Sequence, residues 1–266
     1  SSDSGITYQV KADATATTAQ FVLRKKDSYS GVSLKGAEFT IYQYDKAIEG
    51  WTKWAGNGTG TLTTDENGQA SLAVLDSETA SCLKPDVLYK LVETKAPTDY
   101  QLDATPHYLL FRKNASAENE QQAFAKATGA PGTTLTVGTE TVDLNRNVQV
   151  GSDAGTTTAE YSNVYSNLTV SKLWLDQDTK QPVEPAVDSI HIKVWQYTDN
   201  DKDRTLFAEA DLTAPAWTWS ESGDKLPLTD KNGNAYHYLV EEETTGNWNV
   251  YIDNNGVQTG NITVQN

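Results

Sequence analysis

Three residue types occur in the same order in each half of the chain: a lysine, a glutamate and an asparagine, each on a strand-like segment. In the first half they are Lys25 in FVLRKKD, Glu93 in YKLVE and Asn163 in AEYSN. In the second half they are Lys172 in LTVSKLW, Glu242 in YLVEE and Asn266 in ITVQN. Lysine and glutamate are rarely buried unless they are paired, yet here apolar neighbours alternate with them. The repetition indicates that the three residues act together chemically in each half.

Held together away from water, these three side chains can form a covalent bond. Burial disfavours the charged forms of amines and carboxyls, and a neutral lysine amine is a nucleophile. A protonated glutamate can donate a hydrogen bond to the asparagine carbonyl and can relay protons. Because a fixed geometry gives a very high effective molarity, the amine can attack the amide carbon and expel ammonia. The expected product is an intramolecular Lys–Asn isopeptide bond. Since the domain is both substrate and product, the chain is not expected to be an enzyme.

Two positions of the first set have a competing neighbour. Lys26 follows Lys25, and we favour Lys25 because it precedes Asp27 by two and is in phase with the apolar residues before it. Asn167 competes with Asn163, and alignment of AEYSN with ITVQN favours Asn163.

The segments that must position these residues are rich in β-formers and alternate in polarity. Strands are predicted at 21–26, 37–42, 70–75, 88–93 and 108–112, and again at 168–175, 189–197 and 238–242. An Asp-x-Asn-Gly turn signal occurs in both halves, at 65–68 and 230–233. A repeat of strands predicts an all-β protein of two tandem Ig-like β-sandwiches, at residues 1–165 and 166–266.

The spacing of the residues locates an insertion. Glutamate follows lysine by 68 residues in the first half and by 70 in the second, but asparagine follows glutamate by 70 and by 24. The first domain therefore contains about 46 additional residues by subtraction, within 112–158. Residues 117–127 are rich in good helix formers and predict a short helix. Residues 133–137 and 142–150 predict an extra hairpin.

Composition excludes several classes of function. The net charge of −15 argues against nucleic acid as a partner, and no apolar run is long enough for a membrane span. The chain contains no Met, so we expect a processed or excised piece without its targeting or anchoring segment. The single Cys82 excludes an internal disulfide and is expected to be a small buried residue. The three histidines, His107, His191 and His237, lack ligand spacing, so no metal or cofactor is expected.

The second half resembles the CnaB-type domains of Gram-positive surface proteins and sortase-assembled pilins. The matching segments are 170–174, 190–197, 217–220, 226–227, 230–233, 238–242 and 262–266. The first half resembles the pilin-type relative of this domain, in residues 23–27, 34–39, 65–68 and 89–97. In the family, the glutamate of the Tyr-x-Val/Leu-x-Glu element promotes a Lys–Asn isopeptide bond. The resemblance implies that Glu93 serves Lys25 and Asn163. It likewise implies that Glu242 serves Lys172 and Asn266.

The resemblance also implies a cellular location and a set of partners. It implies an extracellular, cell-wall-anchored pilus protein that sortase joins to other pilin subunits and to the cell wall. The chain has neither the Tyr-Pro-Lys element of a polymerising shaft pilin nor a Leu-Pro-x-Thr-Gly signal. An ancillary or basal pilin that supports adhesion is therefore expected. The alternative is a stalk or ligand-binding region of an adhesin, with 112–158 as a surface for a host ligand.

Overall fold

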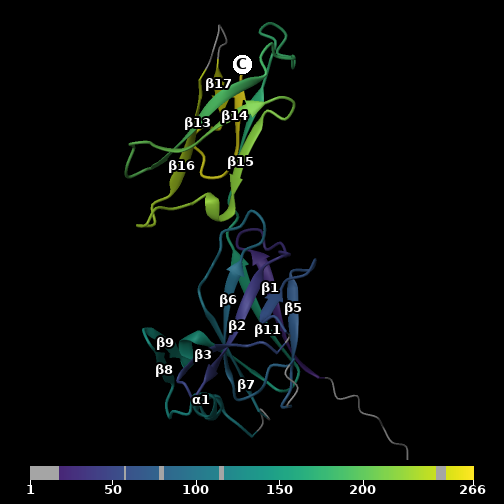
Figure 1. Cartoon of the computed structure of the whole chain (residues 1–266), viewed down its shortest axis with the longest axis vertical. Coiled ribbons are helices and arrows are strands. Elements are labelled where there is room, and N and C mark those ends of the chain that lie inside the picture. The colour runs from purple at the N-terminus through teal and green to yellow at the C-terminus, as the bar shows by residue number, and fades with distance from the viewer. Residues whose placement is uncertain (1–17, 57, 78–80, 114–116, 244–249) are drawn as a thin grey trace, which may run out of the picture.

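The computed structural model describes residues 18–56, 58–77, 81–113, 117–243 and 250–266. Two β-rich units lie end to end along the long axis of the molecule (Figure 1). The short stretch 164–166 joins the last strand of one to the first strand of the other, and the expected division at 165/166 falls within it. The predicted all-β class is confirmed: among the described residues, the only α-helices are α1 (Glu120–Thr128) and α2 (Leu144–Asn147).

The first unit is a sandwich of two sheets. The smaller sheet has the order β11-β1-β5, with β1 at Ala19–Asp27, β5 at Gln69–Val74 and β11 at Thr156–Asn163. The larger sheet has the order β10-β7-β6-β2-β3, with β4 also paired to β2. Its strands are β2 (Glu38–Asp45), β3 (Gly50–Lys53), β4 (Thr61–Thr63), β6 (Leu88–Lys95), β7 (His107–Arg112) and β10 (Val148–Ser152). Alternate residues of both sheets fill the space between them, including Phe21, Leu23, Phe39, Leu91 and Phe111.

The insertion covers the outer face of the larger sheet. Helix α1 and the hairpin of β8 (Thr134–Val137) and β9 (Glu140–Asp143) pack there, with Phe124 and Leu135 against Leu88 and Leu110. The helix has a capping box between Asn119 and Gln122. Since both faces of β7 are covered, four consecutive residues of this strand, 108–111, are buried.

The predicted hairpin of the insertion differs from the structure in its second strand. Residues 133–137 do form a hairpin, in which β8 pairs antiparallel with β9, but β9 ends at Asp143. The Asp143 side chain then accepts a hydrogen bond from the Asn145 backbone and starts α2. The helix turns the chain away, so Val148 and its successors form β10, which runs parallel to β7. The larger sheet thus gains a strand that was expected to belong to the hairpin.

The second unit repeats the sandwich in a shorter form. One sheet has the order β15-β12-β18-β17, and the other has the order β14-β13-β16. The strands are β12 (Asn167–Leu173), β13 (Ser189–Thr198), β14 (Thr205–Thr213), β15 (Thr218–Ser222), β16 (Tyr236–Glu243), β17 (Tyr251–Asp253) and β18 (Gly260–Gln265). Its core includes Val170, Trp174, Ile192, Tyr238 and Val264.

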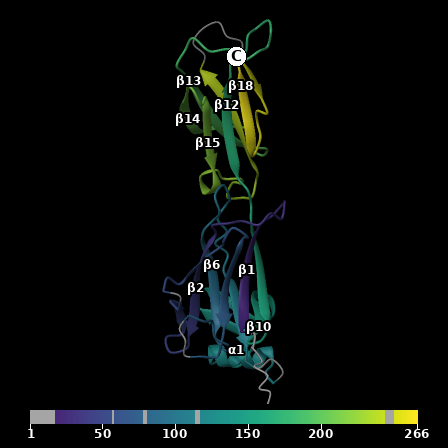
Figure 2. The ribbon, with the colours of Figure 1, turned by 90° about the vertical axis from the view of Figure 1, so that its right-hand side faces the viewer.

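In both units the first and last strands are parallel neighbours. β1 pairs with β11 along its length, and β12 pairs with β18 (Figure 2). A bond between these strands would therefore join the two ends of each domain.

Candidate functional site

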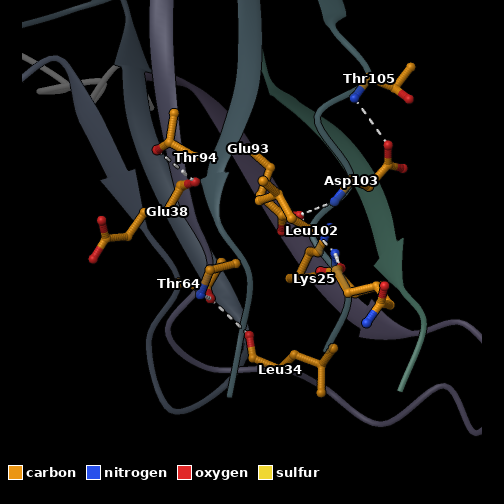
Figure 3. A network of polar contacts seen from close by, with 12 residues as sticks. Lys25, Leu34, Glu38, Thr64, Glu93, Thr94, Leu102, Asp103 and Thr105 are labelled. Carbon is orange, nitrogen blue, oxygen red and sulfur yellow. Dashed lines mark hydrogen bonds and ion pairs between the residues drawn. The ribbon is translucent and has the colours of Figure 1, made fainter. Parts of the chain in front are cut away.

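The first unit brings Lys25, Glu93 and Asn163 together in its interior. The Lys25 Nζ lies 3.1 Å from Glu93 Oε1, and the Asn163 Nδ2 donates to Glu93 Oε2 at 2.7 Å. The three residues are 2%, 1% and 1% exposed. Figure 3 shows Lys25 and Glu93 facing each other from different strands. The glutamate carboxylate bridges the amine and the amide.

Strand register explains this meeting. Lys25 is the fourth inward residue of β1, after Ala19, Phe21 and Leu23. It is opposite Tyr161 on β11, and Asn163 is two residues further on the same face. Glu93 comes from the facing sheet, where it pairs with Phe39 of β2.

The second unit builds the same cluster with the same register. The Lys172 Nζ lies 2.6 Å from Glu242 Oε2, and the Asn266 Nδ2 donates to Glu242 Oε1 at 2.9 Å. Lys172 is opposite Val264 on β18, again two residues before the asparagine. The Lys172 and Glu242 side chains are 0% and 1% exposed.

Burial shifts both amines toward their neutral form. Desolvation lowers the pKa of Lys25 and of Lys172 from the usual lysine value, and the nearby glutamate opposes this shift only in part. Each ammonium also lies over an aromatic ring, at 5.3 Å from the centre of Phe39 and 4.4 Å from that of Trp174. A buried amine with a lowered pKa beside an amide is a candidate nucleophile.

The asparagine carbonyl oxygens share a further property. Asn163 Oδ1 and Asn266 Oδ1 are buried and have no hydrogen-bond partner among the described residues. Negative charge develops on this oxygen when an amine adds to the amide carbon, and a donor there stabilises the transition state. A protonated glutamate in the same cluster would be such a donor.

The competing residues lie elsewhere. The Lys26 Nζ pairs with Glu160 Oε2 at 2.8 Å on the outer face of the sheet, where its side chain is 34% exposed. Asn167 begins β12, and its Oδ1 accepts a hydrogen bond from Thr169 at 3.2 Å. Neither contacts Glu93.

The segment 99–105 also contributes to the first cluster, and no sequence pattern predicts this contribution. The Gln101 carbonyl accepts a hydrogen bond from Asn163 Nδ2 at 2.8 Å. The Asp103 backbone N–H donates to Glu93 Oε2 at 2.9 Å (Figure 3). Both contacts use backbone atoms, so residue type alone could not reveal them.

Comparison with protein families assigns both units. Residues 19–123 match the SpaA prealbumin-like fold domain, and residues 168–266 match the Cna protein B-type domain. The chain is a tandem of these two domain types. The predicted resemblance of the two halves to the pilin-type and CnaB-type domains is thereby confirmed, and both domain families are structural and non-enzymatic. The SpaA-type match ends before Asn163. The position of Asn163 in this domain is therefore seen only in the structure, where β11 pairs with β1.

Comparison with solved structures also finds matches. The shaft pilin SpaA of Lactobacillus rhamnosus GG is 14% identical, with 94% of this chain and 98% of that chain covered and a TM-score of 0.38. Domains D2 and D3 of the major pilin SpaD of Corynebacterium diphtheriae are 24% identical, with 55% and 46% covered and a TM-score of 0.31. The Bacillus anthracis TIE protein is 13% identical, with 93% and 33% covered and a TM-score of 0.30. The chain thus spans one third of the last protein. No curated protein matches the sequence.

Within the described residues, none of the helices is long and apolar enough to cross a bilayer. The same residues include no group of three or more His, Cys, Asp or Glu that could hold a metal ion.

Proposed function

We propose that this tandem protein is a structural subunit of a Gram-positive pilus, ancillary or basal in position, stabilised by two self-formed isopeptide bonds. Lys25 and Asn163 form the first bond, and Lys172 and Asn266 form the second. The domains carrying them are residues 1–165 and 166–266. Sortase joins the protein to other pilin subunits and to the cell wall, where it supports adhesion. The observation that carries the proposal is the doubled cluster, in which one buried glutamate bridges a lysine and an asparagine at the same strand register.

The chemistry follows from the contacts. The amine gives a proton to the glutamate, and the resulting neutral Nζ attacks the asparagine Cγ. The Nζ–Cγ bond forms while the Cγ–Nδ2 bond breaks. One further amine proton travels through the glutamate carboxyl to Nδ2, which leaves as ammonia. Each domain performs the reaction once, with Glu93 or Glu242 as the catalyst.

Intact mass tests the proposal directly. The wild-type chain is expected to be lighter than its sequence mass by two molecules of ammonia, because each bond expels one. Glu93→Gln and Glu242→Gln are each expected to retain one ammonia, since a glutamine cannot relay the proton. Peptide mapping of each variant should show which Lys–Asn pair is lost.

Matched controls lie beside the catalytic residues. Glu241→Gln removes a carboxylate that contacts Arg204 and Trp195 at the surface, and Lys26→Arg changes the outward-facing lysine. Both controls should carry two bonds. A wild-type chain with its full sequence mass would refute the proposal.

A stalk or ligand-binding region of an adhesin is the second candidate. A surface cavity of about 850 Å³ beside β2 and β6 favours it, because aromatic and lysine side chains line this cavity. They include Tyr44, Lys53, Trp54 and Lys84. Adherence of the purified chain to host cells, lost in Lys53→Ala, would support this function. Unchanged adherence in that variant would argue against it.

A further inference from the structure

The segment 99–105 connects β6 to β7 at the end of the first domain that faces the second. Its backbone is fixed to the strand end after Asn163: the Gln101 N–H donates to the Val164 carbonyl at 2.8 Å, and the Ser166 N–H donates to the Asp99 carbonyl at 2.8 Å. It therefore lies between the first cluster and the start of the second domain.

On one side this segment holds reacting groups. The two hydrogens of Asn163 Nδ2 are divided between Glu93 Oε2 and the Gln101 carbonyl. Nδ2 is the group that leaves as ammonia, so these two acceptors fix the plane of the amide that the amine must attack. The Asp103 N–H holds the second of these acceptors in place, because it donates a hydrogen bond to the Glu93 carboxylate.

On the other side the same segment touches the second domain. The Gln101 Nε2 donates to the carbonyls of Gly223 and Leu226, the latter at 3.1 Å. The Leu102 N–H donates to Asp224 Oδ1 at 2.8 Å. The approach is close: a Cβ added at Gly223, whose φ is +61°, would lie 3.2 Å from the Tyr100 carbonyl oxygen.

We propose that docking of the second domain positions the Asn163 amide for reaction, with Gln101 and Asp224 as positioning residues. The inference rests on the proposed isopeptide chemistry. One residue, Gln101, holds the leaving nitrogen through its carbonyl and the second domain through its side chain. Loss of the side-chain contacts leaves the Gln101 carbonyl fixed by backbone hydrogen bonds on one side only, and small misplacements of reacting groups slow reactions greatly.

The second cluster provides an internal reference. The described contacts of the Asn266 amide lead to Glu242, within its own domain. Its reaction should therefore proceed whether or not the domains are docked.

The rates of both reactions can be measured in one full-length chain. Protein made by cell-free translation is quenched in denaturant at successive times, and peptide mapping counts each bond. Gln101→Ala and Asp224→Ala are expected to form the Lys25–Asn163 bond about tenfold more slowly, with the Lys172–Asn266 bond unchanged. Lys225→Ala, an exposed neighbour of Asp224, is the matched control and should react at the wild-type rate.

A conservative variant separates positioning from general stability. Asp224→Asn keeps an oxygen that can accept from the Leu102 N–H, so it should restore the rate. Equal rates in Asp224→Ala, Gln101→Ala and Lys225→Ala would overturn the inference while leaving the isopeptide proposal intact. Absence of both bonds from the wild-type chain would refute the proposed function itself.

Discussion

Lys25 loses more by leaving water than it recovers from its attraction to Glu93, and this imbalance lowers the pKa of the amine. Lys172 has the same imbalance. A buried ion pair often contributes little net stability, because desolvation offsets the attraction. Conversion of the lysine to an amide removes the charge that must be buried. At the scale of single residues, the proposed reaction would thus remove a desolvation cost that the fold imposes.

The lowered lysine pKa predicts that the stability of protein without the isopeptide bond depends on pH. In Asn163→Ala, Lys25 stays a titratable amine with a lowered pKa. At pH values between that pKa and the unfolded value of about 10.4, the unfolded chain therefore binds more protons than the native one. The free energy of unfolding should therefore rise with pH through this window, which ends near the unfolded pKa.

Denaturant titrations between neutral and alkaline pH check this prediction. Lys25→Met is the matched variant, because it lacks both the bond and the titrating amine. The slope of its unfolding free energy against pH should therefore lack the Lys25 contribution. Identical slopes in the two variants would contradict the prediction.

At the scale of elements, β6 and β7 are covered on both faces. The cluster and the main core lie on one side of the larger sheet, and the insertion lies on the other. Glu93 therefore projects from a strand whose back is supported by Leu88 against α1 and the hairpin. The insertion acts as a support for the sheet and does not enter the cluster.

Truncation of Phe124 tests this separation. The side chain is 1% exposed on α1, so Phe124→Ala should lower the free energy of unfolding by about 3–5 kcal/mol. The Lys25–Asn163 bond should still form, as measured by intact mass. Gln121→Ala on the exposed face of the same helix should change neither quantity, and loss of the bond in Phe124→Ala would argue against the separation.

The alternation of apolar residues predicted the strands that carry the cluster, because period-two burial is visible in the sequence around Lys25 and Lys172. It did not predict β10. A parallel partner such as β7 is reached only through a crossover, and residues 142–150 look the same whether they pair locally or at a distance. The role of Gln101 and Asp103 was also invisible, since their backbone atoms make the contacts.

At the scale of the whole molecule, the two proposed bonds would close most of the chain into loops. Lys25 and Asn163 enclose about 140 residues, and Lys172 and Asn266 enclose about 90. By the chain-entropy argument developed for disulfides, each closure should stabilise its domain by about 5 kcal/mol relative to the unlinked chain.

Thermal and denaturant unfolding of Glu93→Gln and Glu242→Gln should show this loss domain by domain. Glu241→Gln provides the baseline. A variant that lacks its bond yet unfolds at the wild-type denaturant concentration would contradict the expected stabilisation.

The parallel pairing of first and last strands has one more consequence. With both bonds present, a continuous covalent route leads from β1 through Lys25 and Asn163 into β12, and from Lys172 to Asn266. Every loop between 26 and 162, and every loop between 173 and 265, is a side branch of that route. A protease that cuts one such loop, for example beside the exposed Lys35, opens a ring but does not divide the molecule. A surface protein of this design would remain in one piece after being nicked.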